Sequence, residues 1–370
     1  MHKAPKSSHP SRRTLLQGVA AASALAAASS FPRPALSQGL KPVTFTTSWL
    51  PEGPNLFAYV ARDKGFWKER GLDVSVARGS GSGAAIQAVG GGKFEFGMGA
   101  TPTAVIQAAK GLPITCIGQI NYDALMGIGV LQDSPIKQPK DLEGKALGAS
   151  VGSGEYPFLP LYAEKAGFDL NNVKIVQLDA KVRERSLLER QVDAVSAFAT
   201  STIPSLVSTG TDVRFLLFSA VGIPFYGQSL TTQPERVKSD PGLCQAVVDG
   251  AMAAIKYTMT NFDDALAIFL KANDEVAMSK TGKEYSRLGL GLTIATNLVP
   301  EVKEHGLGYA DPAKVKNQAE LIVKYGAGAD AKMPDVAALF TNQFVGKMKL
   351  SEAELAASEK AAAPFKKYLG

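Results

Sequence analysis

Hydrophobic and polar positions follow two periods along this chain, and the alternation between them predicts an α/β fold. Short apolar runs rich in β-branched and aromatic residues, such as 43–47 and 74–77, have the length and composition of strands. Alanine-rich stretches with apolar residues at helical spacing lie between them. Repeated strand–turn–helix units indicate parallel sheets with right-handed crossovers.

Residues 74–109 contain two of these units and the most glycine-rich turn. The loop at 79–83 follows one strand, a second strand is predicted at 94–96, and Thr101-Pro102 predicts a helix start with a threonine N-cap. Ligands bind at the carboxyl ends of such strands, and glycines let them approach the backbone N–H groups. Gly79, Gly81 and Ala84 formally match a dinucleotide fingerprint, but no acid ends the next strand. A small-ligand cradle is therefore the better interpretation, with a purely structural tight turn as the alternative.

The same order of elements recurs in the second half of the chain, which predicts two lobes. The strand at 43–47 and its turn to Gly53 correspond to a strand at 146–150 and its turn to Pro157. The segments at 93–102 and 191–204 then match each other in the same way. Two glycine-flanked crossings, at 127–131 and 226–230, are expected to form a hinge. Helical spacing at 244–259, 262–270 and 313–323 predicts a helical C-terminal part.

The first residues have the pattern of an export leader. Arg12 and Arg13 precede a weakly apolar alanine-rich run that ends in a small-residue cleavage site at 35–37. We expect residues 1–37 to be a twin-arginine-type signal peptide and the protein to reach the periplasm; an uncleaved membrane anchor is the alternative. The expected domains are lobe one at 38–128 plus 229–345, lobe two at 129–228, and a C-terminal helical tail at 346–370.

Charge and composition exclude several function classes. The chain has a net charge of +6, but without the leader 35 basic residues face 34 acidic ones, so nucleic acid is not an expected partner. His305 is the one histidine beyond the leader, which argues against a metal cluster or a histidine-based triad. Cys116 and Cys244 lie in apolar segments and are expected to be buried free thiols rather than a bridge. We expect no catalytic residues, no metal and no cofactor.

These features resemble the periplasmic solute-binding proteins of ABC importers, in the group that binds nitrate, sulfonates, taurine and thiamine-pyrimidine precursors. The resemblance covers roughly residues 43–230 and rests on the Trp-Leu-Pro turn at 49–51 and on segments 58–74, 92–97, 110–114, 141–145 and 191–195. It implies two α/β lobes of the type II kind, two hinge crossings, and a solute trapped between the lobes. It also implies a monomer that delivers solute to a permease and ATPase complex.

The turns at the predicted strand ends supply the candidate ligand-binding residues. They are Trp49, Glu52, Asn55, Ser80, Ser82, Thr101, Asn121, Tyr122, Ser153, Glu155, Tyr156, Thr200 and Tyr226. Each has a structural alternative: the tryptophan and tyrosines as packing residues, the glutamates as partners of helix dipoles, and the serines as loop formers.

Two solute classes remain open. Carboxylates and aromatic rings suit a small (hetero)aromatic or pyrimidine-like solute that carries N–H groups. In the pyrimidine-binding members that the chain resembles, the aromatic of a Trp-x-Pro turn stacks on the ring; Trp49 matches it, although Ser48 stands where an aspartate is common. Several helix N-termini favour instead an aliphatic sulfonate, nitrate-like or other organic anion.

Two other function classes are weighed against a binding protein. One is a pyrimidine-biosynthesis enzyme of the same fold, which the lack of a nucleophile–base pair disfavours. The other is a ligand sensor that reports to a membrane receptor.

Overall fold

Two five-stranded sheets with the same strand order form the framework of the computed structural model, which describes residues 1, 39–179, 181–223 and 225–369. The first sheet has the order β2-β1-β3-β10-β4, and β10 runs antiparallel to its two neighbours. Its strands are β1 (Lys41–Thr46), β2 (Leu72–Ala77), β3 (Phe96–Ala100), β4 (Thr115–Gln119) and β10 (Gln228–Thr232).

The second sheet repeats this plan with the order β7-β6-β8-β5-β9, and β5 is its antiparallel strand. Its strands are β5 (Met126–Leu131), β6 (Ala146–Ala149), β7 (Lys174–Gln177), β8 (Ala194–Phe198) and β9 (Val213–Leu217). In each sheet the antiparallel strand is therefore the one that directly follows, in the sequence, a strand of the other sheet: β5 follows β4, and β10 follows β9. The two-lobe α/β fold expected from the sequence is confirmed.

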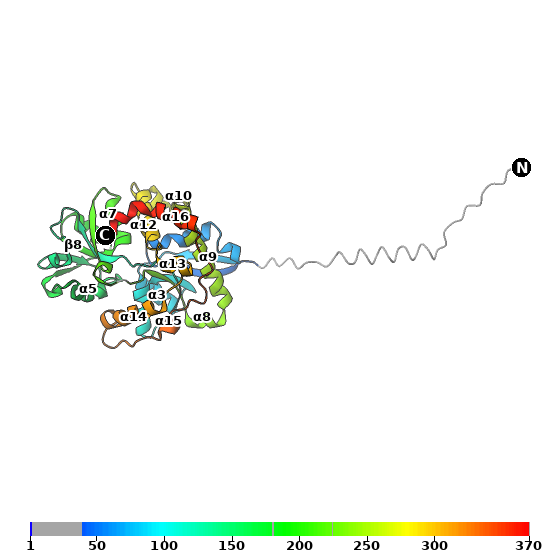
Figure 1. The fold of residues 1–370 in the computed structure, drawn as a ribbon, viewed down its shortest axis with the longest axis horizontal. Helices are drawn as coiled ribbons and strands as arrows, with labels where there is room; N and C mark the ends of the chain where they lie inside the picture. The colour runs from blue at the N-terminus through cyan, green and yellow to red at the C-terminus, as the bar shows by residue number, and fades with distance from the viewer. Residues whose placement is uncertain (2–38, 180, 224, 370) are drawn as a thin grey trace. The chain divides into compact units, whose positions relative to one another are not determined.

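Helices connect the strands and cover the sheets, as Figure 1 shows. Around the first sheet lie η1 (Gly53–Asn55), α2 (Leu56–Asp63), η2 (Lys68–Arg70), α3 (Ser82–Gly90) and α4 (Thr101–Ala109). Around the second lie η3 (Pro139–Leu142), η4 (Tyr156–Phe158), α5 (Leu159–Ala166), η5 (Leu170–Asn172), α6 (Arg183–Leu188), α7 (Ala199–Val207) and η6 (Ser219–Val221).

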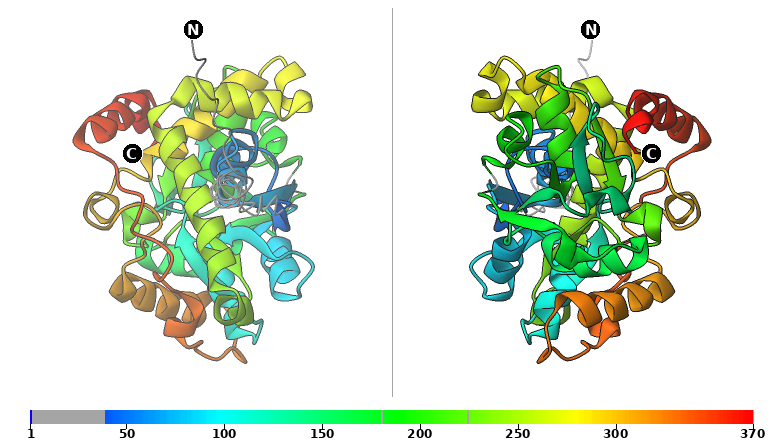
Figure 2. Two further views of the ribbon diagram at one scale, coloured as in Figure 1. Left: turned by 90° about the vertical axis from the view of Figure 1, so that its right-hand side faces the viewer. Right: turned by 90° about the vertical axis from the view of Figure 1, so that its left-hand side faces the viewer.

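The part of the chain after β10 is helical, as predicted. It contains α8 (Pro234–Ser239), α9 (Pro241–Thr260), α10 (Phe262–Lys271), α11 (Asp274–Met278), α12 (Gly282–Ala295), α13 (Pro300–His305), α14 (Pro312–Gly326), α15 (Val336–Leu339), α16 (Glu352–Ala362) and η7 (Ala363–Tyr368). Figure 2 shows α14 and α15 (orange) at the opposite end from α10 to α12 (yellow). At these two ends α12 packs against α7, and α14 packs against η4.

Apolar packing explains the positions of these helices. Helix α2 packs against α9, α10 and β2, and Phe45 and Trp67 lie in the same core. The indole nitrogen of Trp67 donates to the Val247 carbonyl at 3.0 Å, so the buried ring also has its polar group satisfied. Gly250 on α9 leaves the space that this ring fills.

Two local predictions were wrong. Thr101 is not an N-cap: Ala100 occupies that position, and the Thr101 hydroxyl lies 2.7 Å from Ser229 Oγ in the interior. The strand predicted at 94–96 runs instead over Phe96–Ala100, through two glycines. A Cβ on Gly97 would lie 2.8 Å from Val89, and one on Gly99 would lie 2.6 Å from Ile86, so these glycines let α3 pack closely on the sheet.

The predicted hinge crossings also need correction. Residues 127–131 belong to β5, which pairs with β8 and β9, and residues 228–230 belong to β10 in the first sheet. The chain passes between the sheets after Gln119 and again after Leu217. Glycines in β5 misled the prediction, because a Cβ on Gly129 would lie 2.9 Å from the Phe215 ring. The lobe boundaries themselves stay predictions.

Asn121 ties the two connecting segments together. Its carbonyl accepts a hydrogen bond from Gly227 N at 3.0 Å, and its side-chain oxygen accepts one from Gln228 N at 2.9 Å. Its side-chain nitrogen donates to the Asp123 carbonyl at 2.7 Å. This asparagine is therefore a structural link between the lobes rather than a surface residue.

The expected signal peptide lies outside the described residues. From Leu40 onward the chain forms one compact unit. Among the helices of the described residues, none has the length and apolar character needed to cross a membrane.

Replacing Gly250 with alanine should destabilise the protein even though alanine favours a helix interior. A Cβ there would lie 2.1 Å from Trp67 Cδ1, and overpacking of this kind costs about 1–3 kcal/mol. We expect urea denaturation to show a lower free energy of unfolding. Gly83→Ala is the matched control, because nothing lies within 4 Å of a Cβ at that position. Equal stabilities for the two variants would contradict the packing assigned to Trp67.

Candidate functional site

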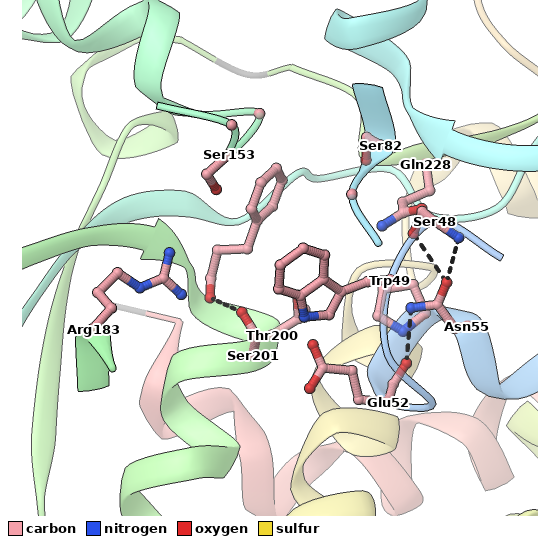
Figure 3. Close-up of a pocket in the computed structure, with 15 residues that line it drawn as sticks. Ser48, Trp49, Glu52, Asn55, Ser82, Ser153, Arg183, Thr200, Ser201 and Gln228 are labelled. Atoms are coloured by element: carbon pink, nitrogen blue, oxygen red, sulfur yellow. Dashed lines mark hydrogen bonds between the residues drawn. The ribbon is translucent and has the colours of Figure 1, made fainter. Parts of the chain in front are cut away.

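A cavity of about 60 Å³ lies where the carboxyl ends of strands from both sheets meet. Its lining residues are Ser48, Trp49, Glu52, Pro54, Asn55, Gly81, Ser82, Gly152, Ser153, Gly154, Arg183, Phe198, Thr200, Ser201 and Gln228. Figure 3 shows Trp49 and Glu52 between Arg183 on one side and Ser48 and Gln228 on the other. The site is therefore built from both lobes, at the edge where ligands bind in open α/β sheets.

Asn55 holds the turn that follows β1. Its side-chain oxygen accepts hydrogen bonds from the Ser48 amide and hydroxyl at 3.0 and 2.9 Å. Its side-chain nitrogen donates to the carbonyls of Leu50 and Glu52, each at 3.3 Å. Because these bonds bridge the whole turn, they fix the positions from which Trp49 and Glu52 enter the cavity (Figure 3).

Glu52 is a buried carboxyl group in the cavity wall. Its residue is only 5% exposed. Burial, with a smaller contribution from the nearby Glu184 carboxylate, raises the pKa of Glu52 from 4.5 to about 8, although Arg183 and Arg78 oppose the shift. Glu52 is therefore mainly protonated at pH 7, and a protonated carboxyl group can both donate and accept hydrogen bonds.

Arg183 is the cation of the site, and it is already paired. Its guanidinium group donates to Glu184 Oε1 at 3.1 and 2.6 Å and to the Ser196 carbonyl at 3.2 Å. The Glu155 carboxylate lies 3.9 Å away. Burial lowers the pKa of Arg183, but Glu184 and Glu155 outweigh it and raise that pKa overall. Two carboxylates thus neutralise one arginine at this wall.

Six of the predicted site residues line the cavity: Trp49, Glu52, Asn55, Ser82, Ser153 and Thr200. Ser82 Oγ accepts a hydrogen bond from the Ala100 amide at 3.0 Å, which holds the start of α3 against β3. Ser153 donates to the Glu155 carboxylate.

Glu155, Tyr156, Ser80 and Thr101 do not line the cavity. Glu155 lies behind the wall, with no exposed surface, and accepts hydrogen bonds from Ser153 and Ser196. Tyr156 packs against an apolar cluster, and Ser80 is exposed. Thr101 is buried, and its hydroxyl lies next to Ser229 Oγ.

Asn121, Tyr122 and Tyr226 lie in the connections between the sheets and do not line the cavity. The rings of Tyr122 and Tyr226 meet edge to face, with centroids 5.8 Å apart. Tyr226 Oη accepts a hydrogen bond from the Asp311 amide at 3.1 Å. These residues shape the hinge, which is the packing alternative considered for the tyrosines.

Sequence reasoning missed Arg183, Phe198 and Gln228 as lining residues. Arg183 opens α6 after β7, and a basic residue at a helix start beyond a strand end was the signal available. Phe198 is the last residue of β8, and its apolar sequence context predicts a core residue. Gln228 begins β10, and its buried Oε1 atom has no hydrogen-bond partner among the described residues.

Neighbouring residues of the same turn face elsewhere. Leu50 and Pro51 line a separate, more open cavity of about 490 Å³, together with Arg78.

Among the residues that the structure describes, no group of three or more His, Cys, Asp or Glu side chains is arranged to hold a metal ion. Cys116 and Cys244 are buried free thiols.

The sequence matches the model of a known protein family. The model of the family described as NMT1/THI5 like matches residues 55–265, which is more than half of the chain.

Individual proteins give weaker but informative similarities. A formylaminopyrimidine-binding protein of Halalkalibacterium halodurans is 23% identical over 239 residues, covering 64% of this chain and 72% of that protein. A 4-amino-5-hydroxymethyl-2-methylpyrimidine phosphate synthase of Saccharomyces cerevisiae is 27% identical over 107 residues, covering only 29% of this chain and 32% of the synthase. The solved structure of the periplasmic aliphatic sulphonate binding protein of Escherichia coli superposes with a TM-score of 0.63 at 14% identity, covering 84% of this chain and 94% of that one. At this identity the structural likeness shows the fold.

The raised pKa of Glu52 should make stability depend on pH. Because folding raises this pKa from 4.5 to about 8, the stabilisation tied to the bound proton is complete below about pH 4.5 and is lost as pH rises through 8. Denaturation at pH 5, 7 and 9 should show the wild type losing more stability than Glu52→Gln. Glu69→Gln, at an exposed position, should follow the wild type. If the stabilities of wild type and Glu52→Gln depended on pH in the same way, Glu52 would not be a buried, protonated carboxyl group.

Proposed function

The chain belongs to the NMT1/THI5-like family, and we propose that it is the extracytoplasmic solute-binding component of an ABC importer. The observation that carries this proposal is the cavity built from equivalent turns of two sheets that share one topology. A solute that touches both lobes stabilises only their closed arrangement, and this difference in affinity drives closure about the hinge. The name of the sulphonate-binding structural relative supports the same role.

The protein is proposed to act in the periplasm as a monomer that passes solute to a permease and ATPase complex. Export by a twin-arginine-type signal at residues 1–37 remains a prediction from the sequence. The expected lobe boundaries, 38–128 plus 229–345 and 129–228 with a tail at 346–370, are proposed with it.

The proposed solute is a small (hetero)aromatic molecule that carries N–H groups, of the formylaminopyrimidine kind. Trp49 and Phe198 supply aromatic surface from opposite lobes. The unpartnered Gln228 Oε1 atom accepts an N–H donor, and the neutral Glu52 carboxyl suits a partner with both a donor and an acceptor. The name of the Halalkalibacterium halodurans relative supports this class.

An organic anion such as an aliphatic sulfonate is the alternative, because Arg183 lines the cavity. The charge balance argues against it. Glu184 and Glu155 lie 2.6 and 3.9 Å from the Arg183 guanidinium group, so an added anion would compete with two carboxylates.

A synthase reaction is the second alternative, and its support is slight. The yeast synthase matches less than a third of the chain. The cavity lining consists of Ser, Thr, Gly, Pro, Asn, Gln, Trp, Phe, Glu and Arg, with neither histidine nor cysteine among its described residues. We therefore propose a binding protein without turnover.

Trp49→Ala should weaken binding of a formylaminopyrimidine about tenfold or more in titration calorimetry. Loss of a ring stacked on an aromatic side chain costs roughly 1–3 kcal/mol. The melting temperature without solute should stay close to the wild type, because Trp49 is half-buried in the cavity wall. Leu50→Ala is the control, since Leu50 lies in the same turn but lines a different cavity. Unchanged affinity in Trp49→Ala would remove the aromatic contact from the proposal.

Glu155→Gln should separate the two solute classes. Removing this carboxylate frees the nearby Arg183 charge, so an alkanesulfonate should bind more tightly to the variant than to the wild type. A formylaminopyrimidine should bind with equal or lower affinity. The measurement is calorimetry of both solutes on both proteins. Tight sulfonate binding by the wild type, strengthened further in the variant, would favour the anion alternative.

A further inference from the structure

The turn after β6 carries a glycine that touches the opposite lobe. A Cβ placed on Gly154 would lie 3.2 Å from Thr103 Oγ1, in the first turn of α4, and 3.2 Å from the ring of Phe198. Such contacts are tighter than ordinary van der Waals packing. Gly154 therefore stands where no side chain fits without moving one of its neighbours.

The equivalent turn of the first lobe also faces the other lobe, at an ordinary van der Waals distance. Gly53 follows β1 as Gly154 follows β6, and a Cβ on Gly53 would lie 3.5 Å from the Thr200 carbonyl oxygen. Thr200 lies in the first turn of α7, the counterpart of α4. On both sides of the cavity a bare backbone turn thus meets the start of a helix from the other lobe.

The contacts flank the two aromatic residues of the site. Trp49 comes from the turn that contains Gly53, and Phe198 is one of the two neighbours of Gly154. Both turns therefore border the cavity that holds the aromatic residues, and the volume of this cavity is about 60 Å³.

We propose that Gly154 and Gly53 are specificity-determining residues: by meeting Thr103 and Thr200 without a side chain, they let the lobes close to a slot that accepts flat solutes and excludes bulky ones. This inference rests on the proposed solute-binding function and adds the shape of the solute. Gly154 is the position to test, because Gly53 has a φ of +41° and any side chain there would strain the backbone.

Gly154→Ala should weaken binding of a formylaminopyrimidine by about fivefold to a hundredfold, the range that overpacking of about 1–3 kcal/mol produces. Small-angle scattering with saturating solute should show a larger radius than for the wild type. The proposal places the solute-free protein mainly in an open arrangement that reaches the contact only transiently, so the melting temperature without solute should change little. Gly83→Ala adds the same methyl group in open space and should bind as the wild type does.

Thr103→Ala in the Gly154→Ala background separates closure from a local effect on Phe198. If contact between the lobes limits closure, removing the Thr103 hydroxyl and methyl groups should restore at least part of the lost affinity and radius change. Absence of any rescue would place the effect within lobe two and overturn the inference. Wild-type affinity in Gly154→Ala alone would overturn it as well.

A crosslinking experiment tests the contact between Gly154 and Thr103 in the absence of solute. Because a Cβ at position 154 would lie 3.2 Å from the Oγ1 atom of Thr103, mild oxidation of Gly154→Cys/Thr103→Cys should link the lobes. Val151→Cys/Thr103→Cys, from the exposed part of the same turn, should crosslink more slowly. Equal rates would refute the contact. If the wild type binds no formylaminopyrimidine while the 154–103 link still forms, the proposed solute fails and the closure geometry stands.

Discussion

The arrangement of the two lobes depends on the one antiparallel strand in each sheet, which is the strand that follows a crossing from the other sheet. Both β5 and β10 run against their neighbours, and each is the strand by which the chain enters or re-enters a sheet. Asn121 bonds the two connecting segments to each other, and Gly227 cannot carry a side chain, because a Cβ there would lie 2.1 Å from the Asn121 amide. The lobes therefore share a short, doubly anchored joint, and in the proposed function a movement at this joint opens or closes the turns that line the cavity.

Electrostatics in the cavity follow from burial more than from the number of charges. Arg183, Glu184 and Glu155 satisfy one another within lobe two, and Glu52 on lobe one meets this group as a neutral acid. In the proposed function such a wall discriminates between solutes by hydrogen-bond pattern, since the groups left to pair are an amide oxygen, a carboxyl group and hydroxyls. The aromatic surface of Trp49 and Phe198 is proposed to add affinity without adding charge.

Local patterns predicted the elements well and their ends less well. The repeated strand–turn–helix order identified both sheets, because strand ends and helix starts leave local signatures in apolar spacing, glycine and proline. Glycines within β3 and β5 were interpreted as turn or hinge residues. Their role is to admit Ile86, Val89 and Phe215 from other elements, and no sequence window contains those contacts.

The sequence by itself determined the two-lobe α/β class, and three of the residues that it proposed in the first turn, Trp49, Glu52 and Asn55, line the cavity. These features depend on neighbours a few residues away, which a local pattern records. Tertiary structure alone decided that Glu155 lies behind the wall, that Arg183, Phe198 and Gln228 line it, and that Glu52 is neutral. Those outcomes depend on which distant groups exclude water from a side chain, and this is settled only when the lobes pack together.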